Sequence, residues 1–590
     1  MRSPSATPAP PSTIERTISR TEWLWLLGAV LFGAILRLSF PGRMAIEHFD
    51  EGVYASNFWF EVEQGGEYPA RHLYAPPLLP LAIEWTMIVA SLCGIKPTGF
   101  IPMIPSLIAG LVTIPSLWWV GRRWFGPSAG IVAAWLVAAS DFHASYSRAA
   151  LTDVPVCLFM LWGVYFMWQA LQSGTRRDIL LAGLFTGLAW WTKYNGWLPL
   201  AIGLSGGAAW QLSLPRADRR LRQFFTRWLL VALTAFVIWS PVLWGLQKHG
   251  GYAAVAANHR QYVGNLDDFE RWCDTALSQM RTIGAYDNWF GALHEAFGEI
   301  RDHQLRAQQE STHEHDEIDQ PNGAATEISR IDTLAAKLSL LATPLILLAL
   351  TAIASAWSLV RDRRSIHRLG GWLLSAWFGG LTLVTPLYYP YPRLVIPWLI
   401  ASWLGVGLAL HLWRERAAHV ATIDPAWKPN RIELVLMVWL VTCCGVRGMI
   451  GASHVWDDRA ELSELSNRFA NKITQTALDS GHPPDEVIVY VYGAPAIFFG
   501  LKSNGLVLVA PVQDLGFLVK PHPRHTFLVV GPRAFRSLAF DPLWASKESP
   551  LENVVKVNMS LSHLVCFDEI HNPHQPHRTT ASYWLERVIP

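Results

Sequence analysis

Long runs of apolar residues alternate with short polar segments along most of this chain. Eleven of these runs are close to 20 residues long, the length that an α-helix needs to cross the hydrocarbon core of a bilayer. A segment inside lipid must satisfy its own backbone hydrogen bonds, so each run predicts a transmembrane helix. The predicted spans are residues 23–40, 101–121, 127–145, 154–172, 178–195, 197–214, 226–246, 337–360, 370–389, 394–413 and 432–451.

A further apolar run, residues 77–94, is shorter and carries Pro80 and Glu84. Arginines lie between many of the spans, and short loops rich in Lys and Arg usually lie on the cytoplasmic side. The spans alternate correctly on this rule only if 77–94 does not cross the bilayer. We therefore expect 77–94 to lie in the interface as an amphipathic or re-entrant helix, with the N-terminus inside.

The polar segments divide the rest of the chain. Residues 452–590 contain no long apolar runs. Their pattern of apolar and polar positions instead predicts a helix over 457–478 and buried strands over 487–492, 506–510 and 526–530. The predicted domains are a disordered cytoplasmic tail at 1–20, a catalytic transmembrane module at 21–246 with its first extracytoplasmic loop at 41–100, a polar extracytoplasmic loop at 247–336, C-terminal transmembrane helices at 337–451 and an extracytoplasmic α/β domain at 452–590.

Composition supports a polytopic α-helical membrane protein. The 590 residues are 51% hydrophobic and 16% charged, whereas soluble domains are about 25% charged. The net charge of +2 does not indicate a nucleic-acid partner. His303, His313 and His315 lie in an acidic part of the 247–336 loop, but charge-dense tracts are usually solvated. We predict no metal ligands there.

The predicted orientation brings chemically active residues from four loops to the outer membrane surface. Ionisable groups at the edge of a membrane domain are costly to bury, so they often serve chemistry or ion handling. The expected catalytic residues are Asp50, Glu51 and Asp153, the expected phosphate-binding residues are Arg148, Lys193 and Arg393, and the expected substrate pocket includes His48, Tyr54, His72 and Tyr389.

Carboxylates and cations in one interfacial pocket fit the transfer of a group from a lipid-linked phosphate. The cations would hold the phosphate and offset charge on the departing oxyanion. Phosphate is a good leaving group, so one carboxylate that takes a proton from the acceptor is sufficient. Crowding of Asp50 against Glu51 is expected to raise one pKa toward that of a useful base.

Ordinary structural roles remain open for several of these residues. Asp50 and Glu51 fit a solvated acidic loop about equally well on position alone. Arg148 and Asp153 also fit an ion pair at a helix end, and Lys193 fits a side chain that extends to the lipid headgroups. The tyrosines of 388–393 are also typical of an aromatic belt at the membrane interface.

The order of these features resembles the C-type-fold polyprenyl-phosphate-sugar glycosyltransferases, the aminoarabinose transferase and protein mannosyltransferase group. The similarity is good over about residues 20–200 and looser over 370–410. The matching pieces are Asp50-Glu51 with Tyr54-Ala55, Pro76-Pro77-Leu78, the 121–126 segment Gly-Arg-Arg-Trp-Phe-Gly, Ser147-Arg148 with Leu151-Thr152-Asp153, Gly187-Leu188-Ala189 with Thr192-Lys193, and Arg393 with Pro397.

The resemblance implies Asp50 as the base that activates the acceptor, Asp153 as a second acid and a polyprenyl-phosphate sugar as the donor. Its acceptor would be a lipid, a glycan or a protein. Val53 and Ala75 stand where many members have Arg and Lys, which removes possible phosphate contacts. Some related folds need a divalent metal ion and others do not, so a metal cofactor stays open.

Two other functions compete with this interpretation. A flippase or transporter of lipid-linked sugars would use the same acids to carry protons or bind a headgroup. A non-catalytic membrane scaffold would bind partners through its C-terminal domain. The glycosyltransferase would be an integral multi-pass protein of the plasma or inner membrane, with its active site facing outside.

Overall fold

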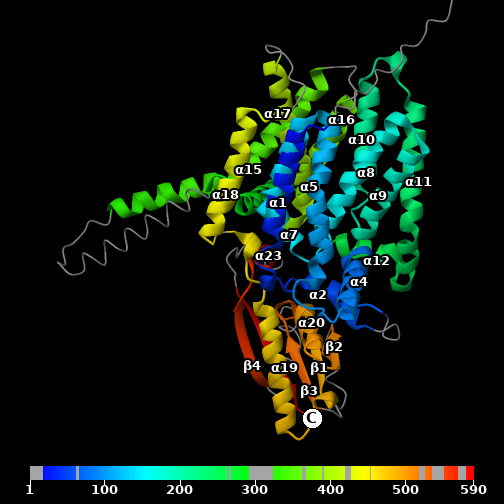
Figure 1. The fold of residues 1–590 in the computed structure, drawn as a ribbon. Helices are drawn as coiled ribbons and strands as arrows, with labels where there is room; N and C mark the ends of the chain where they lie inside the picture. The colour runs from blue at the N-terminus through cyan, green and yellow to red at the C-terminus, as the bar shows by residue number, and fades with distance from the viewer. Residues whose placement is uncertain are drawn as a thin grey trace, which may run out of the picture.

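The computed structural model of this protein describes residues 18–60, 66–260, 262–264, 267–291, 323–361, 367–388, 391–418, 427–451, 453–513, 515–516, 525–534, 551–568 and 580–589. Within these ranges the chain forms a bundle of long helices with a smaller α/β domain at one end (Figure 1). The predicted tail lies largely outside the described residues, and the first helix begins at Arg20. His303, His313 and His315 of the 247–336 loop, for which no metal role was predicted, also lie outside them.

A helix lies at each of the eleven positions predicted to span the bilayer. Seven of the described helices are long and apolar enough to cross a membrane, and the remaining predicted spans coincide with α6–α7, α9, α10 and α16. The bundle helices are α1 (Arg20–Leu38), α5 (Ile104–Phe125), α6 (Pro127–Ala138), α7 (Asp141–Ser147), α8 (Asp153–Ser173), α9 (Arg176–Thr192), α10 (Leu198–Ser213), α11 (Leu221–Leu246), α15 (Gly323–Arg361), α16 (His367–Val384), α17 (Ile396–Ala418) and α18 (Arg431–Met449).

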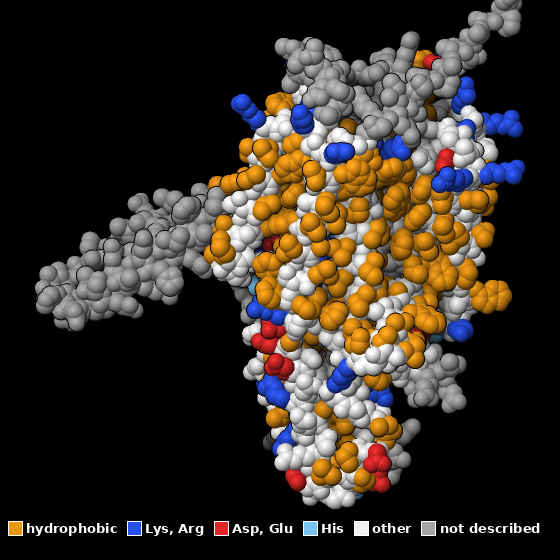
Figure 2. Space-filling model, viewed as in Figure 1, with side chains coloured by type: hydrophobic (Ala, Val, Ile, Leu, Met, Phe, Trp, Pro, Cys, Tyr) orange, Lys and Arg blue, Asp and Glu red, His pale blue; other side chains and the backbone are white. Residues whose placement is uncertain are grey.

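The outer surface of the bundle is apolar, as a lipid-facing surface must be. Figure 2 shows hydrophobic side chains covering the visible face of the bundle, with Lys and Arg gathered at the end away from the α/β domain. On α11 the exposed apolar side chains include Leu229, Leu230, Leu233, Phe236, Val237 and Trp244. Together with the helix lengths, this surface identifies a multi-pass membrane protein.

Short helices cover the end of the bundle next to the α/β domain. The predicted interfacial segment forms α4 (Leu78–Leu92), which lies beside α2 at this end rather than along the bundle (Figure 1). The polar loop after α11 contains two helices that the sequence did not indicate. The helices at this end are α2 (Phe49–Ser56), α3 (Arg71–Tyr74), α12 (Gly251–Arg260) and α13 (Phe269–Tyr286), with 3-10 turns η1 (Pro41–Arg43), η2 (Asn57–Trp59), η4 (Ile101–Met103), η6 (Gln247–His249), η7 (Thr385–Leu387), η8 (Pro392–Val395) and η9 (His454–Trp456). Two further 3-10 turns are η5 (Arg216–Asp218), between α10 and α11, and η10 (Pro484–Glu486), in the α/β domain.

The C-terminal domain contains a five-stranded sheet in the order β2-β1-β3-β5-β4. β1 is parallel to β2 and β3, and β5 is antiparallel to β3 and β4. The predicted helix and three strands are present, while β4 and β5 were not predicted. The elements are α19 (Glu461–Asp479), β1 (Ile488–Tyr492), α20 (Pro495–Ser503), β2 (Leu508–Val512), β3 (Thr526–Val530), β4 (Leu551–Ser560), α23 (His563–Asp568) and β5 (Thr580–Val588).

The two parts of the molecule pack closely at α2 and α20. A Cβ atom added at Gly52 of α2 would lie 2.4 Å from the backbone nitrogen of Ala496 on α20. Glycine is therefore the residue that permits this approach. The contact places the acidic stretch after the first span directly between the membrane bundle and the α/β domain.

Candidate active site

Helix α2 directs the two adjacent acids to different partners. His48 caps the helix, and its Nδ1 accepts the backbone N–H of Asp50 at 3.0 Å. The Glu51 carboxylate accepts the N–H of His48 at 2.9 Å, which completes a reciprocal capping arrangement. Consecutive helical residues point about 100° apart, so Asp50 and Glu51 face different neighbours.

Asp50 forms an ion pair with a residue that lies 343 positions later in the chain. Arg393 of η8 donates from Nη1 to Oδ2 of Asp50 at 2.7 Å, and the Asp50 residue is only 5% exposed. Burial by itself raises the pKa of Asp50, but Arg393, His48 and Arg533 lower it below its usual range. The expected increase in pKa from crowding with Glu51 is therefore wrong for Asp50, which is ionised at neutral pH.

A second buried ion pair joins Asp153 and Lys193. Asp153 begins α8 and Lys193 follows the last residue of α9, so the two antiparallel helices bring both residues to the same end of the bundle. Lys193 Nζ lies 2.5 Å from Asp153 Oδ1, and Asp153 is 2% exposed. Lys193 thus pairs with an acid instead of reaching toward lipid, and Asp153 pairs with Lys193 instead of Arg148.

The two ion pairs share one electrostatic environment. The buried hydroxyl of Tyr54 on α2 has a pKa well above its usual value because of burial and because of both Asp50 and Asp153. Burial lowers the pKa of His259 on α12, and the charges of Lys193, Asp50 and Arg393 also act on its ring. Charges of both ion pairs therefore act on Tyr54 and on His259.

Polar atoms at this site remain available to a ligand. Oδ2 of Asp153 and Nε2 of His259 are buried and have no hydrogen-bond partner in the described part of the chain. Nδ1 of His259 lies 2.7 Å from the hydroxyl oxygen of Tyr388, which fixes the ring. Buried polar groups are almost always paired in folded proteins, so such atoms indicate a place where substrate or water binds.

Glu51 and Arg148 form hydrogen bonds and ion pairs with other parts of the protein. Glu51 is fully buried, forms an ion pair with Arg459 and accepts the N–H of Ala150 at 2.7 Å. The guanidinium of Arg148 donates to the carbonyl oxygens of Arg37 at 2.9 Å and Ser39 at 2.6 Å, at the end of α1. Both side chains are thus engaged by protein groups, and the catalytic role expected for Glu51 and the phosphate-binding role expected for Arg148 stay predictions.

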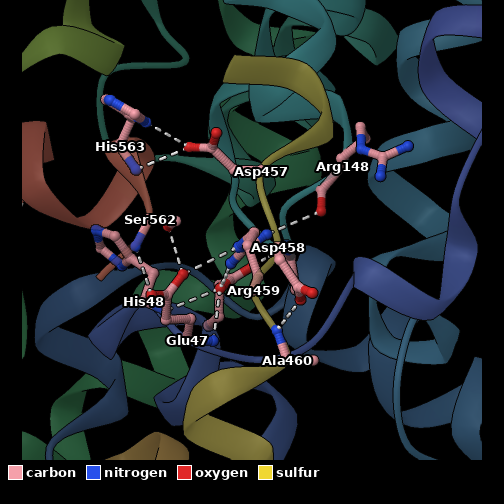
Figure 3. A network of polar contacts seen from close by, with 11 residues as sticks. Glu47, His48, Arg148, Asp457, Asp458, Arg459, Ala460, Ser562 and His563 are labelled. Atoms are coloured by element: carbon pink, nitrogen blue, oxygen red, sulfur yellow. Dashed lines mark hydrogen bonds and ion pairs between the residues drawn. The ribbon is translucent and has the colours of Figure 1, made fainter. Parts of the chain in front are cut away.

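Arg459 connects these buried groups to the α/β domain (Figure 3). Its side chain also contacts Glu47 and donates to the carbonyl oxygen of Arg148 at 3.0 Å. Glu47 in turn accepts the N–H of Ser562 at 2.8 Å. Burial raises the pKa of Glu47 to about 6, against the opposing effects of Arg459 and Ser562.

An amphiphilic cavity of about 370 Å³ is lined in part by Tyr194, the residue that follows Lys193 in the chain. Its polar wall includes His72, whose carbonyl oxygen accepts the hydroxyl of Tyr194 at 2.5 Å. Its apolar wall comes from α11 and α9. The lining residues are Glu67, Arg71, His72, Ala75, Pro76, Pro77, Trp191, Tyr194, Pro241, Val242, Gly245, Leu246, Lys248 and His249.

The residues predicted to line the substrate pocket lie in different places. His48 is buried as the cap of α2, Tyr54 is buried and its pKa is raised by burial and by both acids, and His72 lines the cavity. Tyr389 lies outside the described residues. A larger cavity of about 470 Å³ between α19, α20 and residues 96–99 contains none of the predicted site residues.

His259 and Tyr388 at the site, and Arg459 in the buried network around Glu51, were missed as individual residues. His259 lies in the long polar loop, which gave no helical signal strong enough to place it beside the acids. Tyr388 is part of the tyrosine cluster that was expected near this surface, one position before the residue chosen. Arg459 lies at the start of the α/β domain, and the residues around it in the sequence do not indicate that it pairs with buried acids.

Two groups of described residues offer three potential metal ligands each. Glu67, His72 and His249 form one at the cavity, and His454, Asp457 and His563 form the other at the domain boundary. Asp50 and Asp153 belong to neither group, and each already faces a cation. The donor set around the acids thus does not resemble a metal site.

Residues 76–244 match the family model described as dolichyl-phosphate-mannose-protein mannosyltransferase. This match contains Asp153 and Lys193 and ends before the segments that supply His259 and Arg393. A search of curated proteins finds no match.

Three solved structures are similar to this chain to different extents. The apo oligosaccharyltransferase of Archaeoglobus fulgidus has 13% identity and a TM-score of 0.50, covering 90% of this chain and 72% of that one. ArnT of Cupriavidus metallidurans bound to undecaprenyl phosphate has 15% identity and a TM-score of 0.49, covering 88% and 95%. The Pmt1-Pmt2 protein O-mannosyltransferase complex of S. cerevisiae bound to its sugar donor has 18% identity and a TM-score of 0.31, covering 41% and 34%.

The similarity to the archaeal enzyme extends over both the membrane bundle and the C-terminal part of the chain. It confirms the fold class predicted from the sequence, although the number of crossings is not fixed by it. The protein therefore has the C-type membrane glycosyltransferase fold, with a protein mannosyltransferase family match over residues 76–244.

Proposed function

We propose that this protein is a membrane glycosyltransferase that moves a hexosyl or pentosyl group from a polyprenyl-phosphate donor to a lipid, glycan or protein acceptor. The observation that carries the proposal is the pairing of two buried acids with two cations at one end of a membrane bundle, beside an amphiphilic cavity. The family match over residues 76–244 and the fold support the same reaction class.

Asp50 is the proposed base. Its carboxylate takes the proton of the acceptor nucleophile while that nucleophile bonds to C1 of the sugar. The bond between C1 and the phosphate oxygen breaks, and its electron pair leaves with the polyprenyl phosphate. Arg393 keeps Asp50 ionised before the donor binds. When Arg393 turns to the donor phosphate, the carboxylate loses its partner and becomes a stronger base.

The donor occupies the cavity with its phosphate toward the cations. Trp191, Val242 and Leu246 provide an apolar wall for the first prenyl units. Lys193 and Arg393 bind the phosphate oxygens and stabilise the charge that develops on them. His72 lines the polar side of the same cavity, as does Ala75, the position where many members of the resembled family have a lysine. Asp153 Oδ2 and His259 Nε2 orient the sugar or the acceptor.

The active site faces the extracytoplasmic side of the plasma or inner membrane. The arginines in the last turn of α5 and the first turn of α9 lie opposite the α/β domain, at the end where Figure 2 shows basic side chains gathered. Such loops stay in the cytoplasm, so the acids and the α/β domain lie on the other side. Asp50 and Asp153 already face cations, so no step of the reaction is assigned to a metal ion.

The test uses full-length protein in detergent with a polyprenyl-phosphate sugar labelled in the sugar. Lipid phosphate should be released only when an acceptor is present, and Asp50→Asn should lower turnover about 100-fold or more. Asp485→Asn removes an exposed carboxylate in the α/β domain and serves as the control. Full turnover in Asp50→Asn would contradict the assignment of the base. Movement of intact donor across a vesicle without cleavage would instead indicate a flippase.

A further inference from the structure

Two segments that meet at the boundary between the bundle and the α/β domain carry a separate cluster of metal-binding side chains. His454 lies in η9 and Asp457 follows this turn, just after α18. His563 begins α23, between β4 and β5. One ligand atom from each residue lies within 4.8 Å of the others. Asp457 and His563 are 106 residues apart, so only the folded chain assembles this cluster.

The cluster already has the contacts of a partly organised site. Nδ1 of His563 lies 2.8 Å from Oδ2 of Asp457, and Figure 3 shows the two side chains pointing toward each other. The rings of His454 and His563 are 4.1 Å apart between centroids. The ring of His454 also packs edge-on against Tyr286 at 5.3 Å, which limits its orientation.

We propose that His454, Asp457 and His563 form a binding site for a divalent cation of the Zn²⁺ class. Two imidazoles and one carboxylate are ligands that Zn²⁺ accepts, whereas Ca²⁺ and Mg²⁺ prefer oxygen ligands. Ligand atoms about 2.1 Å from a tetrahedral Zn²⁺ lie about 3.4 Å from one another. The ligand atoms already lie within 4.8 Å of one another, so only small side-chain movements are needed to reach this spacing. Water completes the fourth position.

The surroundings hold the ligands near these positions. Ser562, next to His563, is fixed because its N–H is accepted by Glu47 at 2.8 Å. Trp456 in η9 donates from its indole nitrogen to the carbonyl oxygen of Leu36 at 3.2 Å. Preorganised ligands lose less conformational entropy when a metal binds. The bound ion would link the segment after α18, the last membrane helix, to the α/β domain.

This site is distinct from the cavity beside the acids. The other group, Glu67, His72 and His249, lines that cavity and would bind a metal next to the donor. None of these residues is shared with the boundary site. A metal at the boundary therefore affects the attachment of the α/β domain, and its binding can be measured without any glycosyl transfer.

The test measures zinc content and thermal stability of full-length protein in detergent. The protein is treated with a chelator, dialysed, and mixed with ZnCl₂, and bound zinc is counted by mass spectrometry. We expect His563→Ala and Asp457→Asn to bind one zinc fewer than the unmodified protein. Zinc should raise the Tm of the unmodified protein more than that of either variant.

Two controls assign the result to this site. His482→Ala removes a histidine of the same domain that lies beside His525 and outside both groups, so it should bind zinc like the unmodified protein. His249→Ala disrupts only the cavity group and should keep the boundary zinc. The proposal is overturned if His563→Ala and Asp457→Asn retain the full zinc content, or if zinc leaves the Tm of the unmodified protein unchanged.

Discussion

Arg393 Nη1 lies 2.7 Å from Asp50 Oδ2, and this ion pair joins residues that are 343 positions apart in the chain. It connects α2, which follows the first membrane helix, to η8, which precedes α17. The proposed base is therefore held by a cation that the donor phosphate would also attract. This competition couples donor binding to the basicity of Asp50.

Replacement of Arg393 tests this coupling through the pH dependence of turnover. Arg393 lowers the pKa of Asp50 while burial raises it, so Arg393→Ala should raise this pKa. A base works only when ionised, and the acidic limb of the pH profile should therefore move to higher pH. Arg393→Lys keeps the charge and should show a smaller shift. If Arg393→Ala and the unmodified enzyme have the same acidic limb, the pKa of Asp50 does not determine that limb.

The membrane part of the fold was predictable because lipid imposes a strict length on each helix. Every predicted span coincides with a helix, whatever its detailed sequence. The strands β4 and β5 were missed because neither gives a clear sequence signal, and β4 in particular is largely exposed. Helices α12 and α13 were missed because they lie in a polar segment and pack at the end of the bundle.

The site was predictable only as far as chain topology determines it. The alternation of spans was enough to bring Asp50 and Asp153 to the same surface, before any side-chain partner was known. The roles of Glu51 and Arg148 depended on contacts that no local pattern encodes. Glu51 pairs with Arg459, which is 408 residues away. Arg148 donates hydrogen bonds to backbone carbonyls, which are the same in every residue type and so leave no signal in the sequence.

Lys193 should matter more for the donor than for the acceptor. Lys193→Met removes the cation that pairs with Asp153 and leaves a buried carboxylate without compensation. We expect kcat/KM for the donor to fall about 100-fold, which corresponds to about 2.7 kcal/mol. The acceptor KM should change much less. Kinetics with each substrate varied separately measure this, and Lys472→Met on the exposed surface of α19 is the control. A larger effect on the acceptor KM would place the phosphate elsewhere.

Arg148 should be a stability residue without a direct effect on the donor. Its guanidinium donates to carbonyl oxygens at the end of α1, so Arg148→Met leaves buried acceptors without their donors. Such a loss costs about 1–3 kcal/mol. The Tm in detergent should fall while the donor KM of the folded fraction stays constant. Arg468→Met, an exposed arginine on α19, should leave both values unchanged. An increase in donor KM without a lower Tm would contradict this prediction and support a role for Arg148 in binding the phosphate.

Gly52 should control how firmly the α/β domain is attached to the membrane bundle. A Cβ at this position would meet the backbone nitrogen of Ala496 at 2.4 Å, and backbone atoms cannot move aside as a flexible side chain can. Gly52→Ala should therefore push α2 and α20 apart at a cost of about 1–3 kcal/mol. Limited proteolysis should then release the α/β domain faster, and the Tm should fall.

The matched control for this change is Gly379→Ala, because a Cβ at Gly379 in α16 meets no atom within 4 Å. That substitution should leave the rate of proteolysis unchanged, since alanine also favours the helix. Turnover provides a second readout, because separation of α2 from α20 disturbs the helix that positions Asp50. If Gly52→Ala and Gly379→Ala behave alike in both assays, contact between α2 and α20 is not what holds the base in place.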